Sequence, residues 1–296
     1  MTHAAEPPHT LALGIAPVGR KDFRLAVRVQ NRAFEGSREL AAIKKQAKDE
    51  VEMRYIGRVM KCALPWYRQR QRPLLIGCSI GHFKITAGTL GCFVQARAGG
   101  SLCVLSNNHV LANENRGTKG DAVVQCGVYD GGQVPDDTVA KLQDFVGLKR
   151  QGANEVDCAI AALEDSVLAD RTKLHGLGKL AGLGEVFLNE GVPVSKIGRT
   201  TGLTYGRVTA FELDNVVVDF DTGAMRFDHQ IEIEGAENEP FSDDGDSGSL
   251  IIGSDKRGVA LLFAGSDQGG ANGCGLTYAN PLGLVLEALK VDLALA

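Results

Sequence analysis

The chain has 296 residues, of which 44% are hydrophobic and 23% are charged, and its formal net charge at pH 7 is −4. This composition is typical of a globular protein, and the length suffices for one large domain or two small ones. The negative charge and the lack of a long Lys/Arg run argue against nucleic acid as a partner. Residues 1–19 do not resemble a signal peptide, and the longest apolar runs, such as 259–264, are too short to span a membrane, so no membrane partner is expected.

Seven cysteines are an odd number, and they are scattered without a Cys-x-x-Cys pair. They lie at positions 62, 78, 92, 103, 126, 158 and 274. This pattern predicts reduced, mostly buried thiols in a cytoplasmic protein, not a disulfide framework or a zinc site. We therefore expect no metal and no cofactor.

The first 64 residues predict a small α+β unit. Two strands, a helix and a third strand are expected at Thr10–Ile15, Phe23–Val29, Ser37–Lys48 and Val51–Val59. This ββαβ unit carries no catalytic pattern, and its sequence leaves open whether it inhibits, targets or serves as a scaffold. The polar, arginine-rich stretch 65–75 is interpreted as a linker.

From residue 76 onward the sequence consists of short apolar stretches separated by glycine turns such as 98–100 and 130–132. Two blocks of about six short strands follow each other, at about 76–165 and 190–281, and a helix is expected at 282–291. Because strands do not alternate with helices, this pattern favours a mainly β protein with two six-stranded antiparallel barrels over a parallel α/β sheet.

The most informative motif is Gly245-Asp246-Ser247-Gly248, which is followed at once by the apolar run Leu250–Ile252. Glycines on both sides of a serine let the backbone turn sharply and direct several N–H groups into a small volume. An acyl-transfer enzyme needs a serine oxygen that attacks and N–H donors for the oxygen that becomes negative. Taken alone, the motif is also compatible with an ordinary turn.

Two further residues make the enzymatic interpretation stronger. His109 follows an apolar strand in Leu105-Ser106-Asn107-Asn108-His109, and Asp157 interrupts the apolar run Val156–Leu163. Taken singly, each is compatible with a structural role. A carboxylate within an apolar strand requires a partner, however, and an imidazole N–H is a sufficient one. The chain order His, Asp, Ser is that of chymotrypsin and differs from the orders in subtilisin and the α/β-hydrolases.

On these motifs the chain resembles a trypsin-like serine peptidase of the chymotrypsin fold over residues 75–290. The segments that carry the resemblance are Gly88–Gly91, Val104–His109, Val156–Ile160 and Gly245–Ser249. Two further segments, Gly77–His82 and Lys196–Thr204, resemble a bacterial intracellular subgroup related to the narrow-leaf peptidases of plants.

The resemblance implies that Ser247 is the nucleophile, that His109 is the general base and then acid, and that Asp157 orients the imidazole. It also implies an oxyanion hole formed by the backbone N–H groups of Gly245 and Ser247. The partner would be a protein or peptide substrate, whose identity the sequence does not give. The oligomeric state stays open.

For substrate binding, the resemblance implies that Val259–Ser266 pairs with an extended substrate and that Ala264 and Gly265 leave room for the first specificity pocket. Phe241 occupies the place where trypsin has an aspartate at the base of that pocket. This difference predicts a preference for uncharged side chains over Arg or Lys. No activation sequence is recognisable near the start of the first barrel.

An acidic run precedes the nucleophile motif and consists of Glu234, Glu237, Glu239, Asp243 and Asp244. We interpret it as a solvated loop, with cation binding or attraction of basic peptides as the alternative. Two functions remain in competition: a serine endopeptidase, and a catalytically silent peptide-binding or regulatory module on the same fold.

Overall fold

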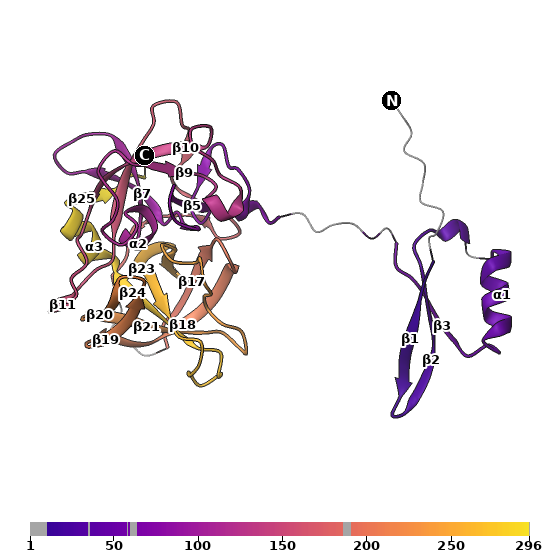
Figure 1. The fold of residues 1–296 in the computed structure, drawn as a ribbon. Coiled ribbons are helices and arrows are strands. Elements are labelled where there is room, and N and C mark those ends of the chain that lie inside the picture. The colour runs from indigo at the N-terminus through magenta and orange to yellow at the C-terminus, as the bar shows by residue number, and fades with distance from the viewer. Residues whose placement is uncertain (1–10, 35, 58, 60–63, 186–190, 296) are drawn as a thin grey trace. The chain divides into compact units, whose positions relative to one another are not determined.

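The computed structural model describes residues 11–34, 36–57, 59, 64–185 and 191–295. The chain divides into two compact units, residues 1–63 and 64–296 (Figure 1). None of the helices in these described residues is long and apolar enough to cross a membrane.

The first unit is a three-stranded sheet with one helix. In chain order its elements are β1 (Leu11–Gly19), β2 (Asp22–Val29), η1 (Arg32–Phe34), α1 (Arg38–Gln46) and β3 (Val51–Tyr55). The hairpin partners β1 and β2 are antiparallel, whereas β2 and β3 are parallel, so the chain needs the crossover that α1 provides. Ser37 caps α1 by accepting the N–H of Leu40, whose side chain packs on Val27 and Val29. The predicted ββαβ order is what the structure contains.

The second unit is built on two curled sheets, which are antiparallel except for the short strand β16 that pairs parallel with β23. In spatial order the first contains β25 (Val291–Leu293), β7 (Cys92–Ala96), β8 (Leu102–Ser106), β12 (Ala159–Leu163), β10 (Thr138–Phe145), β9 (Ala122–Val124), β5 (Ser79–His82) and β6 (Gly88–Thr89). The second contains β16 (Gly182–Leu183), β23 (Arg257–Gly265), β22 (Leu250–Gly253), β17 (Pro193–Gly198), β18 (Gly202–Leu213), β21 (Gln230–Gly235) and β24 (Leu276–Pro281). A pairing of β23 with β24 closes six of these strands into a barrel.

The first sheet has eight strands and, within the described residues, no pairing that closes it, and the C-terminal segment supplies its edge strand β25. Helix α3 (Leu282–Leu289) ends before Lys290, whose left-handed backbone (φ 54°) turns the chain. The chain then continues as β25 beside β7, with Val291 fully buried. The observed helix is therefore two residues shorter than the expected helix 282–291. It ends at Leu289 because Val291 is buried as part of the sheet.

Short elements complete the second unit. The helical ones are η2 (Trp66–Arg68), α2 (Asn108–Leu111) and η3 (Val128–Asp130). The strands are β4 (Leu74–Leu75), β11 (Ala153–Asn154), β13 (Ala169–Asp170), β14 (Lys173–Leu174), β15 (Gly178–Lys179), β19 (Val216–Phe220) and β20 (Gly223–Phe227). The β19–β20 hairpin extends from the second sheet, and β20 pairs with β11, which precedes Asp157.

The stretch 65–75, interpreted from sequence as a linker, is packed into the second unit. Leu74 is fully buried, and β4 pairs with β13. Arg68 forms an ion pair with Asp130 at 2.8 Å. The polar composition of this stretch reflects side chains that contact the unit, so the boundary between the units lies near residue 64.

One hydrophobic core extends across both sheets of the second unit, since it contains Leu105 and Ile160 from the first and Leu250 and Leu261 from the second. Where the two sheets meet, their backbones are so close that there is no room for a side chain at Gly248. A Cβ atom placed on this residue would lie 2.4 Å from the carbonyl oxygen of Thr89. Ser247, the predicted nucleophile, directly precedes this glycine.

Candidate active site

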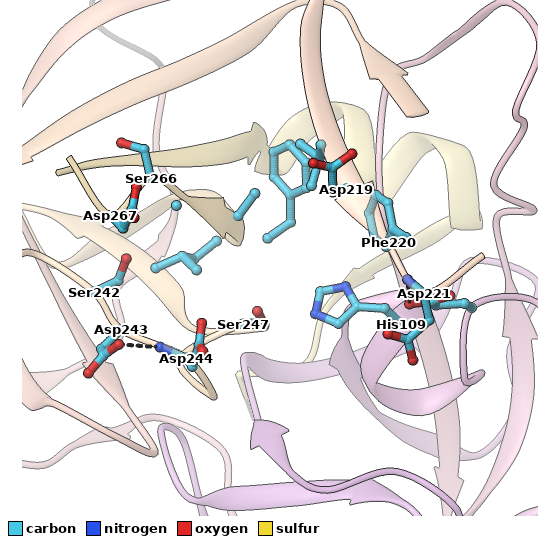
Figure 2. Close-up of a pocket in the computed structure, with 16 residues that line it drawn as sticks. His109, Asp219, Phe220, Asp221, Ser242, Asp243, Asp244, Ser247, Ser266 and Asp267 are labelled. Carbon is cyan, nitrogen blue, oxygen red and sulfur yellow. Dashed lines mark hydrogen bonds between the residues drawn. The ribbon is translucent and has the colours of Figure 1, made fainter. Parts of the chain in front are cut away.

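A cleft of about 440 Å³ contains both His109 and Ser247 (Figure 2). Its lining comes from His109 in α2, from Glu114 after this helix, from residues 218–221 of the β19–β20 hairpin, from residues 242–244 and 247, and from residues 262–267 at the end of β23. Both sheets therefore contribute to one site, and residues far apart in the sequence meet there.

His109 is held by a fully buried carboxylate. The chain passes from β8 through Asn107 into α2, and this single helical turn places the imidazole at the cleft. The Nδ1 atom of His109 lies 2.5 Å from Oδ2 of Asp157. The Asp157 side chain is completely buried, whereas the His109 side chain retains 21% of its exposure. The imidazole therefore bridges a buried charge and the open cleft.

Backbone groups satisfy the rest of the Asp157 carboxylate. Its Oδ1 atom accepts the N–H groups of Asn108 at 2.7 Å and of His109 at 3.3 Å. The amide side chain of Asn107 donates to the carbonyl oxygen of Asp157 at 2.8 Å. These hydrogen bonds offset the cost of burying the carboxylate.

Two buried amides in the second barrel, which the sequence reasoning missed, hold Asp157 from the other side. The backbone N–H of Asp157 donates to Oδ1 of Asn280 at 2.9 Å, and Asn280 in turn donates to Oε1 of Gln230 at 2.6 Å. Gln230 donates to the carbonyl oxygen of Glu155 at 3.0 Å. The only signal in the sequence is a polar side chain near the end of a strand, which is too common to single them out.

The environment makes His109 a stronger base than a free histidine. Burial by itself lowers the pKa of His109, but the charge of Asp157 and the hydrogen bond to it oppose this effect, and Glu114 adds a smaller contribution. The net result is a pKa above the usual value of 6.5. Figure 2 shows the imidazole and the Ser247 side chain pointing toward one another, so the serine faces a group suited to take its proton.

The loop around Ser247 needs glycine at two positions. Gly245 and Gly248 have φ angles of 94° and 91°, in the left-handed region that side chains other than glycine rarely adopt. The carbonyl oxygen of Ser247 accepts the N–H of Thr89 at 2.8 Å, which fixes the peptide orientation. Neither the N–H of Gly245 nor that of Ser247 donates to an acceptor in the described part of the chain. The oxyanion hole expected from these two N–H groups stays a prediction.

A buried ion pair holds the residue next to Ser247. The Nζ atom of Lys196 lies 2.9 Å from Oδ2 of Asp246, and both side chains are fully buried. The other oxygen of Asp246 accepts the N–H of Thr200 at 2.7 Å. Burial lowers the pKa of Lys196, and the Asp246 charge opposes this shift without cancelling it. The sequence marks Lys196 only as the first residue of the segment Lys196–Thr204, because a lysine in a strand gives no sign of being buried.

A second network positions the Asp244–Gly245 segment of the loop. Thr200 donates through its hydroxyl to the carbonyl oxygen of Asp244 at 2.5 Å, and Arg199 contacts that hydroxyl at 3.1 Å. The Nε and Nη2 atoms of Arg199 donate to the two oxygens of Asp130, at 2.7 and 2.8 Å, and Arg68 binds the same carboxylate. A chain of polar contacts thus runs from η2 to the loop before Ser247.

The predicted specificity residues separate into two groups. Ala264 and Gly265 line the cleft, together with Ser242. Phe241 does not line the cleft, and its side chain is 1% exposed within the core of the second barrel. Its ring packs in that core with Ile233 and Ile251. Phe241 as the base of the specificity pocket stays a prediction: its apolar ring is buried in the barrel core, and its polar neighbour Ser242 lines the cleft.

The described residues contain no group of three or more His, Cys, Asp or Glu side chains that could hold a metal ion. The six described cysteines are free thiols, and burial raises the pKa of both Cys78 and Cys92 to about 12. Such thiols behave as apolar core groups and not as nucleophiles.

No protein-family model and no curated protein sequence matches the chain. Solved structures do match it. A chymotrypsin from Cellulomonas bogoriensis is 17% identical, with a TM-score of 0.50 over 75% of this chain and 98% of the other. Protease A from Thermobifida fusca is 16% identical, with a TM-score of 0.50 over 74% and 97%. A glutamic-acid-specific serine protease is 19% identical, with a TM-score of 0.53 over 75% and 100%. Together with the closed barrel, the curled first sheet and the C-terminal helix, these matches show that the chain has the chymotrypsin fold.

Proposed function

We propose that this chain is a serine endopeptidase with Ser247 as nucleophile, His109 as general base and Asp157 as the residue that orients the imidazole. The observation that carries the proposal is the hydrogen bond from His109 to the buried Asp157, in the same cleft as Ser247. Asp157 holds the proton of the imidazole on Nδ1, so that Nε2 is free to accept one from the serine hydroxyl.

In this mechanism the Ser247 oxygen attacks the carbonyl carbon of the scissile peptide bond while its proton moves to Nε2 of His109. The carbonyl oxygen becomes negative and is stabilised by the N–H groups of Gly245 and Ser247. His109 then gives the proton to the departing amine, which leaves an ester on Ser247. Water attacks this ester with His109 again as base, and the free serine and a carboxylic acid product result.

The cleft also supports a polypeptide substrate. Ala264 and Gly265 end the barrel strand β23 beside Ser247 and present little side-chain bulk to the cleft. An extended peptide would therefore be able to approach the backbone of this segment. The solved structures with the same fold include a chymotrypsin and a glutamic-acid-specific serine protease, and this supports the same chemistry here.

The experiment is labelling with a fluorophosphonate probe, combined with hydrolysis of a denatured protein mixture. We expect the probe to label the wild type and not Ser247→Ala, and we expect Ser247→Ala and His109→Ala each to lose about 10⁵–10⁶ in kcat. Ser254→Ala, at an exposed serine outside the cleft, is the control and should behave as wild type. A folded wild type that the probe does not label would instead support a silent peptide-binding module.

Two finer assignments belong to the same proposal. The segments Gly77–His82 and Lys196–Thr204 support a relationship to the bacterial relatives of plant narrow-leaf peptidases. The second of these contains Lys196 and Thr200, both of which contact Asp246. A cytoplasmic location is supported by the free, buried thiols, which are typical of proteins in reducing compartments.

A further inference from the structure

The cleft that contains Ser247 has a strongly acidic lining. Six carboxylates line it, and among its described lining residues there is no lysine or arginine. These carboxylates belong to Glu114, Asp219, Asp221, Asp243, Asp244 and Asp267. A cleft lined by charges of one sign concentrates ligands of the opposite sign.

Only part of this charge is balanced by the protein. Arg116 lies 3.4 Å from Glu114 and 3.5 Å from Asp221, so one cation serves two carboxylates. In the part of the chain that the structure describes, the other four carboxylates form no ion pair. The nearby cations Lys196 and Arg199 are already bound to Asp246 and Asp130. The cleft therefore keeps an excess of negative charge.

The unbalanced carboxylates lie on both sides of Ser247. Figure 2 shows Asp219 on the His109 side of the cleft, and Asp243, Asp244 and Asp267 on the opposite side. All four residues are exposed. None of them forms a buried base to a side-chain pocket, and the expected base residue Phe241 lies in the barrel core. Substrate recognition would thus rest on several solvent-exposed carboxylates. Water and salt weaken the attraction between each of them and a substrate cation.

We infer that the substrate of this site is a polypeptide segment that carries several lysine or arginine side chains around the scissile bond. This inference rests on the proposed peptidase function. An extended segment presents successive side chains to opposite sides, so its basic groups would meet carboxylates on both sides of the cleft. One exposed pair contributes little, but several acting together set the preference, which depends on the number of cations and not on a single position.

A metal ion is a weaker explanation of the same charges. The described residues contain no group of three or more potential ligands close enough to hold one. Carboxylates spread along both sides of a cleft match the spacing of side chains on a polypeptide better than the few ångströms of a coordination sphere.

The test uses fluorogenic peptides of one sequence that carry zero, one or three lysines, with acetyl-lysine at the remaining positions to keep the shape. At low ionic strength we expect kcat/KM of the full chain to rise about tenfold or more from zero to three lysines. In 0.5 M NaCl most of this rise should disappear, because salt screens exposed charges. A ratio near one at low salt overturns the inference.

The matched variant is Asp219→Asn/Asp244→Asn/Asp267→Asn, which keeps the side-chain shapes and removes three charges. The ratio of kcat/KM between the three-lysine and zero-lysine peptides should fall at least threefold in this variant. It should stay unchanged in Asp165→Asn, which removes an exposed charge outside the cleft. An unchanged ratio in the triple variant contradicts the inference.

A neutral fluorophosphonate probe separates this inference from the proposed function. If the probe labels Ser247 and the peptides are cleaved without regard to their charge, the substrate inference fails and the peptidase proposal stands. If the probe does not label the folded protein, the peptidase proposal itself fails.

Discussion

At the scale of single residues, the charge of Asp157 determines the behaviour of His109. The carboxylate is fully buried, and protein groups satisfy both of its oxygens. Burial lowers the pKa of His109, but the charge of Asp157 and the hydrogen bond to it, with a smaller contribution from Glu114, raise it above the usual value. The base should be neutral and active above this pKa, and protonated and inactive below it.

We therefore expect kcat/KM to fall as the pH is lowered through an apparent pKa above 6.5, the usual value for histidine. In Asp157→Asn, kcat at neutral pH should drop by about 10⁴, because the amide holds the imidazole in the wrong tautomer. The apparent pKa of the remaining activity should decrease, since burial still acts on His109 without its opposing charge. The pH dependence of kcat/KM for both proteins is the measurement. A variant with wild-type turnover would reduce Asp157 to a structural residue.

Lys196 carries a second prediction at this scale. Lys196→Met leaves the fully buried Asp246 without its cation, which should lower the free energy of unfolding by about 3–5 kcal/mol, measured by urea denaturation. The double variant Lys196→Met/Asp246→Asn removes the stranded charge and should recover part of this loss.

The matched control is Lys141→Met, which breaks an exposed pair with Glu164 at 3.8 Å and should change stability by less than about 1 kcal/mol. Fluorophosphonate labelling of Ser247 should slow in Lys196→Met under conditions where the protein is still folded. Equal effects of the two lysine variants would show that the buried pair does not hold the loop.

At the scale of elements, the loop before Ser247 depends on segments from other parts of the fold. The turn between β17 and β18 holds it through Thr200, and η3 holds that turn through the two bonds from Arg199 to Asp130. The loop geometry is thus shared between both sheets, and no single segment of sequence encodes it.

Asp130→Asn tests this arrangement. The variant removes the charge that binds Arg199 and Arg68, so we expect the Asp244–Gly245 segment to lose part of its order and kcat to fall by about tenfold or more with KM nearly unchanged. The control is Asp137→Asn, which affects a more exposed pair with Arg70. Steady-state kinetics on one peptide substrate decide the matter. An effect on KM alone would contradict a role in positioning the loop.

At the scale of the whole molecule, the two compact units have separate hydrophobic cores. The segment after residue 63 belongs to the second unit, because Leu74 is buried there and Trp66 stacks on His175 with ring centroids 4.6 Å apart. The second unit should therefore fold without the first, but only if it retains this segment.

We expect a chain starting at Leu64 to unfold cooperatively and to be labelled by the fluorophosphonate probe. A chain starting at Ile76 should have a clearly lower Tm, because it lacks β4 and Arg68, one of the two arginine partners of Asp130. Thermal unfolding followed by circular dichroism compares the two. Equal melting temperatures would restore the interpretation of 65–75 as a linker.

Much of the fold could be predicted from the sequence because it is encoded locally. Glycine turns between short apolar stretches indicated a β protein, and the spacing of apolar residues indicated the N-terminal ββαβ unit. The motifs around His109, Asp157 and Ser247 indicated the three residues that the structure then brings to one site. Their catalytic roles stay a prediction until Ser247→Ala and His109→Ala are measured.

Only the tertiary structure showed the features that depend on contacts between distant segments. The direction in which Phe241 packs, the burial of Lys196 against Asp246 and the attachment of residues 64–75 to the second unit are examples. The collection of carboxylates on both sides of one cleft is another. The physical reason is common to all of them: burial and electrostatic environment are set by neighbours in space, and in a β-barrel those neighbours come from strands far apart in the sequence.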